Sequence, residues 1–187
     1  MRKKVTCLYP VALFFMLLFV VSTVSAETLS LAVEKVEDGD TIMATLNGKS
    51  ERLQLQGIDA PEDVENAKLK RDIKVTGLDS ATLLPLGAAA TRHLQELVKV
   101  GETLQFNGDF AQRDRYGRIL VVAINSDGRS LNELMVQNGY AIMTRYGAIE
   151  PGLKARLEKL ESEAVASKRG LWGENRAATI TWSGLKN

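Results

Sequence analysis

The chain has 187 residues, of which 45% are hydrophobic and 25% are charged, and its formal net charge is +1 at pH 7. A charge so close to zero excludes binding to nucleic acid through an overall positive field, so any such contact must come from a local patch. The single cysteine, Cys7, excludes a disulfide within the chain.

Residues 1–26 have the pattern of an export signal. Basic residues at 2–4 precede an apolar run over 11–21, and small residues follow at 24–26. We expect cleavage, with a retained anchor as the alternative, because the run is short for a membrane-spanning helix. The remaining 161 residues, 27–187, suit one domain with a formal charge of −2. The sequence thus predicts a periplasmic or secreted protein with no stable membrane association after cleavage.

Short apolar runs between turn signals predict a strand-rich fold with a few helices. Strands are expected over 29–37, 41–46, 51–58, 103–112 and 119–125. Asn47-Gly48 between two such runs is a strong hairpin signal. Helices are expected over 87–100, 130–139 and 151–168, from their apolar spacing and capping residues. The segment 63–84 is expected to be a long surface excursion, and the tail from Glu174 has no clear pattern.

Five short strands with a helix between the third and the fourth are the element order of an OB-type barrel. We therefore predict an α+β fold in which a five-stranded OB-fold β-barrel carries three α-helices. Such barrels often bind oligonucleotides or oligosaccharides, although a fold by itself does not establish an activity.

Two acidic segments follow strands that should be neighbours in such a barrel. They are Asp-Gly-Asp-Thr at 38–41 and Gly-Ile-Asp-Ala-Pro-Glu at 57–62. Carboxylates brought together repel each other unless a cation lies between them, and calcium prefers carboxylate, carbonyl and water oxygens. The alternative is that the first segment is a plain turn and that Asp59 only ends a strand.

A third segment, Asp-Arg-Tyr-Gly-Arg at 114–118, is a polar turn between two predicted strands. The planar guanidinium of an arginine can bind two phosphate oxygens and keeps its charge at any working pH. An ordinary solvated hairpin loop is the alternative. Taken together, the three segments offer two acids for a metal, a third acid to activate water and an arginine for a phosphate.

These motifs resemble those of the staphylococcal nuclease (thermonuclease) family. The matching segments are Asp-Gly-Asp-Thr at 38–41, Gly-Ile-Asp-Ala-Pro-Glu at 57–62, Asp-Arg-Tyr-Gly-Arg at 114–118, Leu-Asn-Glu at 131–133 and Lys-Arg-Gly-Leu-Trp at 168–172. They occur in the family's order and approximate spacing and cover the chain from about residue 31 to residue 172.

The resemblance implies a calcium-dependent nuclease that cuts DNA and RNA, preferably single-stranded, with little sequence preference and leaves 3′-phosphate ends. It implies that Asp40, Asp59 and the main-chain carbonyl of Ala60 bind Ca²⁺. Glu62 would orient or deprotonate the attacking water, and Arg118 would stabilise the phosphate in the transition state. Supporting contacts to the nucleotide are implied for two residues of the third motif, Arg115 and Tyr116. A monomer is expected.

One position departs from the family pattern. Members usually carry a second active-site arginine five residues before the aspartate that corresponds to Asp59, and here that position is Gln54. Glutamine can donate a hydrogen bond to a phosphate but supplies no charge, which would slow catalysis. Arg52 lies two residues earlier, on the same strand face, and is a possible substitute. The alternative is that Arg52 is an ordinary exposed strand residue.

The departure keeps a second function open, which is an OB-fold module that binds nucleic acid or protein and has lost or weakened catalysis. A third hypothesis is a calcium-stabilised exported protein with no role on nucleic acid. Among other polar residues, His93 is expected at a helix surface or boundary. The cluster Lys68, Lys70, Arg71 and Lys74 is either a solvated face or a surface that tracks phosphates.

Overall fold

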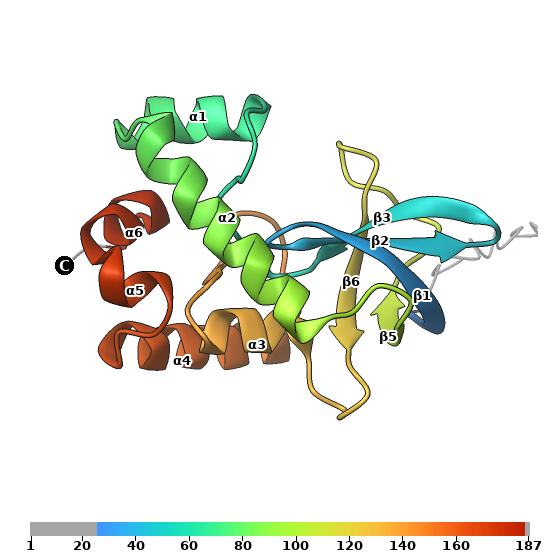
Figure 1. Cartoon of the computed structure of the whole chain (residues 1–187). Helices are drawn as coiled ribbons and strands as arrows, with labels where there is room; N and C mark the ends of the chain where they lie inside the picture. Colours follow the sequence, from blue (N-terminus) through green and yellow to red (C-terminus); the bar gives the residue numbers. More distant parts are fainter. Residues whose placement is uncertain (1–25, 186–187) are drawn as a thin grey trace, which may run out of the picture.

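The computed structural model describes residues 26–185, so the predicted export signal at 1–26 lies outside the described residues except for its last residue. A strand barrel and a group of helices stand side by side, and helix α2 runs between the barrel and the C-terminal helices (Figure 1). Within the described range, no helix has both the length and the apolar character that a membrane crossing would need.

Five strands form the closed barrel. They are β1 (Glu27–Asp38), β2 (Thr41–Leu46), β3 (Lys49–Leu55), β6 (Ile119–Ile124) and β5 (Thr103–Gly108), in that order around the barrel. Strands β3 and β6 are parallel and the other neighbours are antiparallel. The predicted α+β fold with a five-stranded OB-fold barrel is confirmed.

The β2–β3 hairpin has the turn that its sequence predicts. Asn47 and Gly48 both have positive φ, at 52° and 74°, as a two-residue hairpin turn requires. The register of the hairpin pairs Thr41 with Gln54. Gln54 therefore lies beside the β1–β2 turn, next to the acidic segment at 38–41.

Alternation along β3 separates the barrel core from the outer face. Leu53 and Leu55 point inward and are fully buried, and they pack with core side chains such as Ile42 and Phe106. Because successive strand residues face opposite sides, the side chain of Gln54 lies outside the barrel interior. The core thus fixes the strand whose outer face carries the position where the family usually has an arginine.

The helices are more numerous than the sequence predicted. They are α1 (Ala67–Thr76), α2 (Ser80–Leu97), α3 (Leu131–Gln137), α4 (Pro151–Ala166), α5 (Leu171–Glu174) and α6 (Arg176–Ser183). A small two-stranded sheet pairs β4 (Ile58–Asp59) with β7 (Ile142–Met143).

The prediction of a long loop over 63–84 is wrong, because α1 and the first turn of α2 occupy most of it. Helix α1 buries a single residue, Leu69, so its apolar periodicity is weak. Its ends are nevertheless marked, since the side chain of Asn66 caps the first turn and Gly77 ends the helix in the left-handed conformation. Capping signals define this helix better than its hydrophobic pattern does.

Close packing of α2 against the loop after β4 needs a glycine in the helix. A Cβ atom at Gly87 would lie 2.1 Å from the carbonyl oxygen of Glu62 and 2.5 Å from the backbone nitrogen of Asp63. No side chain fits there without moving backbone. Helix α2 therefore sets the position of the Glu62 main chain.

Asn132 ties the end of the barrel together. Its side chain is fully buried, accepts a hydrogen bond from the Ala123 backbone N–H and donates to the carbonyl oxygens of Gln56 and Val121. Buried polar groups need such partners, and an asparagine provides both donors and an acceptor. This explains why an asparagine in the motif at 131–133 belongs to the fold and not to the site.

Candidate active site

An open cavity of about 420 Å³ lies on the outer side of the barrel. Its lining comes from the β1–β2 turn, the end of β3, β4, helix α1 and two loops, and includes Asp40, Gln54, Asp59, Glu62, Lys68, Arg71, Arg115, Tyr116, Arg118, Thr144 and Tyr146. Most of the predicted site residues are thus brought into one cavity from segments that are far apart in the sequence.

One wall of the cavity is acidic. Asp40 is 5% exposed, and its Oδ2 accepts a hydrogen bond of 2.9 Å from the Ala60 backbone N–H, which joins the two acidic motifs. Thr41 Oγ lies 3.1 Å from Asp40 Oδ1. The backbone N–H of Asp40 donates to Asp38. These contacts hold Asp40 in place beside the strand that carries Asp59.

Burial and mutual repulsion disfavour the charged form of these acids. Burial raises the pKa of Asp40 to about 7, with a further contribution from Asp38. Burial also raises the pKa of Asp59 to about 6, and the charge of Asp40 adds to that rise. Lys68 lowers both values, which indicates that the wall depends on a neighbouring cation.

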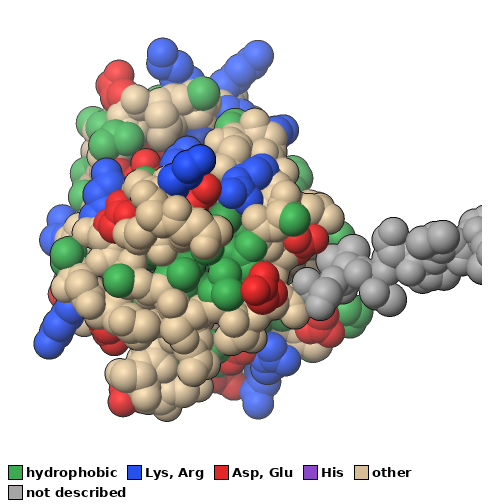
Figure 2. Space-filling view, turned by 90° about the vertical axis from the view of Figure 1, so that its right-hand side faces the viewer, with side chains coloured by type: hydrophobic (Ala, Val, Ile, Leu, Met, Phe, Trp, Pro, Cys, Tyr) green, Lys and Arg blue, Asp and Glu red, His purple; other side chains and the backbone are tan. Residues whose placement is uncertain are grey.

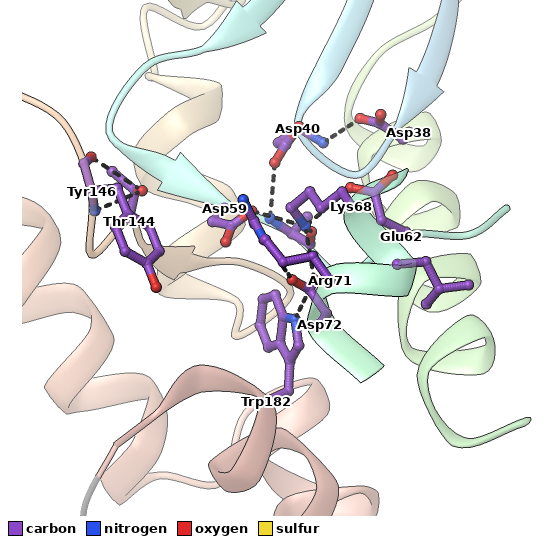
Figure 3. Close-up of polar contacts among 12 residues, drawn as sticks. Asp38, Asp40, Asp59, Glu62, Lys68, Arg71, Asp72, Thr144, Tyr146 and Trp182 are labelled. Atoms are coloured by element: carbon purple, nitrogen blue, oxygen red, sulfur yellow. Dashed lines mark hydrogen bonds and ion pairs between the residues drawn. The ribbon is translucent and has the colours of Figure 1, made fainter. Parts of the chain in front are cut away.

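Lys68 supplies that cation. Its Nζ lies 3.1 Å from Asp59 Oδ1, 3.0 Å from Glu62 Oε1 and 2.9 Å from the carbonyl oxygen of Ala60 (Figure 3). Although burial alone would lower it, the charges of Asp59, Glu62 and Asp40 raise the pKa of Lys68 above its usual range. The sequence placed this lysine only in a basic surface cluster and gave no sign of its contact with the acids.

A second wall of the cavity is basic and is built within one turn. The guanidinium of Arg118 lies 2.8 Å from Asp114 Oδ2, and Asp114 Oδ1 accepts hydrogen bonds from the backbone N–H groups of Tyr116 and Arg118. Burial alone would raise the pKa of Asp114, but these hydrogen bonds and the charge of Arg118 lower it. Asp114 therefore orients the predicted phosphate-binding arginine.

Gln54 lines the cavity, whereas Arg52 does not. Gln54 is 7% exposed, and its Oε1 lies 3.3 Å from Thr41 Oγ, so its amide borders the acidic wall. Arg52 instead forms an ion pair of 2.6 Å with Glu37. The only arginines on the cavity lining, within the described residues, are Arg71, Arg115 and Arg118.

Two exposed aromatic side chains stand at the cavity. Tyr116 is 52% exposed and its ring lies 4.7 Å from the guanidinium carbon of Arg115, and Tyr146 is 73% exposed. Tyr146 was not among the predicted site residues. Its only sequence signal is the adjacent Gly147, a residue that is typical of turns and loops.

The remaining predictions fall away from the cavity. The side chain of His93 is 15% exposed and stacks on Tyr140, with ring centroids 4.1 Å apart. Trp172, from the motif at 168–172, is fully buried in a cluster with apolar side chains of α1, α2, α4 and α6. Both residues contribute to packing.

The oxygen atoms of the acidic wall are chemically suited to a hard cation. Among residues 26–185, no three His, Cys, Asp or Glu side chains gather closely enough to hold a metal by themselves. A hard cation also accepts carbonyl and water oxygens, so two carboxylates and one carbonyl are a sufficient protein contribution. The contacts of the Lys68 ammonium with Asp59 and Ala60 show that these oxygens already converge on one positive group.

Comparison with known proteins shows the family to which the chain belongs. The profile of the family described as staphylococcal nuclease homologue matches residues 52–174. The chain belongs to this family. The SPbeta prophage-derived endonuclease YokF of Bacillus subtilis (strain 168) is 31% identical over 157 residues, which cover 82% of this chain and 47% of that protein. A protein described as an uncharacterized endonuclease of Escherichia coli is 34% identical over 142 residues, or 76% of each chain. Endonuclease YncB of Bacillus subtilis (strain 168) is 30% identical over 156 residues, which cover 80% of this chain and 64% of that protein.

The resemblance inferred from the motifs is therefore confirmed, and the relatives support a nuclease function for this staphylococcal nuclease homologue. The chain spans about half of YokF and three quarters of the Escherichia coli protein. The acidic segment at 38–41 and helix α6 both lie outside the family match. The structure places the first of them in the cavity wall.

Proposed function

We propose that this staphylococcal nuclease homologue is a calcium-dependent enzyme that hydrolyses phosphodiester bonds of DNA and RNA. The observation that supports this most is that Asp40, Asp59 and Glu62 line the same cavity as Arg118. Hydrolysis of a phosphodiester needs an activated water on one side of the phosphorus and a positive charge on the phosphate oxygens. The two walls offer these groups.

Calcium would be held by Asp40, Asp59 and the carbonyl of Ala60, and would supply Lewis-acid stabilisation of the phosphate. Glu62 orients a water molecule and accepts its proton as the oxygen–phosphorus bond forms. Arg118 binds the non-bridging oxygens, whose negative charge increases in the transition state. The bond from phosphorus to the 5′ oxygen breaks, and that oxygen takes up a proton from solvent as it leaves. The phosphate stays on the 3′ side.

The exposed rings support the proposal of single-stranded substrates with little sequence preference. Tyr116 and Tyr146 stand at the cavity with more than half of their surface free. Stacking of a base on an aromatic ring tolerates any sequence, because every base has a π-face, and it needs bases that are not already paired. On the face drawn in Figure 2, positive and negative side chains are interspersed, which supports an attraction to the nucleic acid backbone that is local to the site.

The proposal is tested by incubating the full chain with denatured DNA and with RNA, in calcium and in chelator. Cutting that needs calcium and is lost in Glu62→Gln is expected, because a glutamine cannot accept the proton. Labelling of 5′ ends with and without prior phosphatase treatment distinguishes the products, because 3′-phosphate products have a free 5′-hydroxyl that is labelled without the phosphatase. Cutting that is equal in chelator, or unaffected by Glu62→Gln, would reject the mechanism.

A second function is favoured by one observation, which is the uncharged Gln54 on the cavity lining. A catalytically weakened module would retain the two walls for binding and lack turnover. Single-stranded DNA that binds the chain in calcium but is not cut after prolonged incubation would favour this alternative.

Export and the monomeric state are further parts of the proposal. The pattern at 1–26 supports export to the periplasm or the medium, with a retained anchor as the alternative. Sequencing the N-terminus of the protein recovered from each cell fraction tests the cleavage. Light scattering on the purified protein tests the monomer.

A further inference from the structure

Lys68 occupies the place where the oxygens of the acidic wall converge. It is the second residue of α1, and its ammonium contacts one oxygen each from Asp59, Ala60 and Glu62, at 2.9 to 3.1 Å. An ammonium group has three N–H donors and no acceptor, so three oxygens can satisfy it. Two of these oxygens belong to the proposed metal ligands, and the third belongs to the proposed base.

A metal ion and this ammonium cannot use the same oxygens at once. Both are cations, and two positive charges in contact with the same carboxylate repel each other strongly in a partly buried site. Binding of a metal therefore requires the Lys68 side chain to leave. The side chain can swing into solvent, because it is 21% exposed and borders the open cavity.

Lys68 also has contacts with Asp72 and with the C-terminal helix α6. Asp72, one turn later on α1, lies 3.4 Å from the ammonium and accepts a hydrogen bond from the indole N–H of Trp182. The ring of Trp182 lies 5.9 Å from the same ammonium. Trp182 belongs to α6, which lies beyond the part of the chain that matches the family. The C-terminal helix thus helps to hold the lysine against the acids (Figure 3).

We propose that Lys68 is a tethered cation that keeps the acidic wall neutralised without metal and must be displaced before calcium binds, so that this residue sets the calcium affinity of the site. The inference rests on the proposed calcium-dependent function. Displacement of the Lys68 ammonium from Asp59, Ala60 and Glu62 would then be the main energetic cost of calcium binding.

Calcium titration by calorimetry of the full chain tests the inference, with Lys68→Met compared with the unchanged protein. The substitution removes the competing ammonium and keeps an unbranched side chain, so calcium should bind about tenfold more tightly or better, since affinity follows the charge of the ligand set. The matched control is Arg71→Met. It removes a positive charge from the same helix and the same cavity, but Arg71 contacts neither Asp59 nor Glu62, so its effect should stay below about threefold.

Thermal unfolding shows whether the variant is folded and how much stability it loses when the ammonium is removed. In chelator, Lys68→Met should melt at a lower temperature than the unchanged protein, because Asp40, Asp59 and Glu62 lose the positive charge beside them. It should gain more from added calcium than the unchanged protein does. In nuclear magnetic resonance spectra, the Lys68 ammonium signal of the unchanged protein should move toward that of a solvated lysine during calcium titration.

Three results would overturn the inference. They are equal calcium affinity for the Lys68→Met and unchanged proteins, an equal effect of Arg71→Met, and a Lys68 signal that calcium leaves in place. Absence of calcium binding by every variant would overturn both this inference and the calcium dependence of the proposed function. Tighter calcium binding by Lys68→Met, together with no hydrolysis of nucleic acid by the unchanged protein, would support the inference and reject only the proposed function.

Discussion

The two walls of the cavity carry opposite charges and obtain their geometry in different ways. The acidic wall brings together Asp40 and Glu62 from separate loops, fixed by the Ala60 N–H and by the close approach of α2 at Gly87. The basic wall is one surface turn, in which Asp114 holds Arg118. Tertiary packing therefore determines the first wall, and local hydrogen bonding determines the second. Substitutions remote in sequence should disturb the acidic wall, whereas the basic wall should respond only to its own turn.

The largest effect is expected for the basic wall. Replacement of Arg118 by alanine should lower kcat/KM on denatured DNA about 10³-fold, because a preorganised cation on the transition-state phosphate is lost. The melting temperature should hardly change, since the side chain is bound within an exposed turn. Steady-state kinetics and a thermal melt measure both. A loss of activity that is matched by a loss of stability would show that Arg118 supports the fold.

A substitution in α2, distant in sequence from the acidic motifs, should disturb the acidic wall almost as much. Gly87→Ala would push the Glu62 backbone, and a displacement of about 1 Å can cost about 100-fold in rate. The steric clash should also lower the free energy of unfolding. Helix propensity alone predicts the opposite, namely a gain in stability of roughly 0.5–1 kcal/mol for alanine in place of glycine in a helix.

Denaturant unfolding of Gly87→Ala separates these two effects. A lower midpoint together with reduced kcat would confirm that α2 positions Glu62. A stabilised protein with unchanged kcat would contradict the idea that tertiary packing sets the acidic wall.

A smaller effect is expected when the internal partner of the arginine is changed. Asp114→Asn keeps an Oδ1 that can accept the backbone hydrogen bonds of the turn, but it removes the ion pair with Arg118. We expect kcat/KM to fall about tenfold, because an oriented guanidinium loses less freedom when it binds a phosphate. The measurement is kcat and KM at two salt concentrations. An increase in affinity would instead show that Asp114 competes with the phosphate, as Lys68 is proposed to compete with the metal.

The sequence predicted the barrel well because local signals determine it. Alternation and the Asn47-Gly48 turn defined the strands, and the five motifs located the acids and Arg118. Helix α1 was missed because it has only one buried residue, and α6 because its apolar residues pack against α1 and α2, which cannot be inferred from its own segment. Caps such as Asn66 and Gly77 carried the missing information.

The contacts made by Lys68 could not be predicted for a physical reason. In the sequence it is one of four basic residues between 68 and 74, and nothing distinguishes it from Lys70 or Lys74. Only the closure of the barrel and the docking of α1 bring its ammonium to Asp59. A charge pair between two separate elements, here β4 and α1, depends on tertiary structure, whereas the pair between Asp114 and Arg118 follows from a spacing of four residues.

The smallest effect is expected at Gln54, the position that departs from the family pattern and borders the acidic wall. Gln54→Arg places a charge on the cavity lining beside Thr41, and we expect kcat/KM to rise about threefold to tenfold, since charge-assisted hydrogen bonds to phosphate are stronger than neutral ones. Kinetics on denatured DNA measure the gain. Arg52→Ala is compared in parallel, and a loss of similar size would assign the missing charge to Arg52. A fall in activity for Gln54→Arg would show that the acidic wall does not tolerate a second fixed cation beside Lys68.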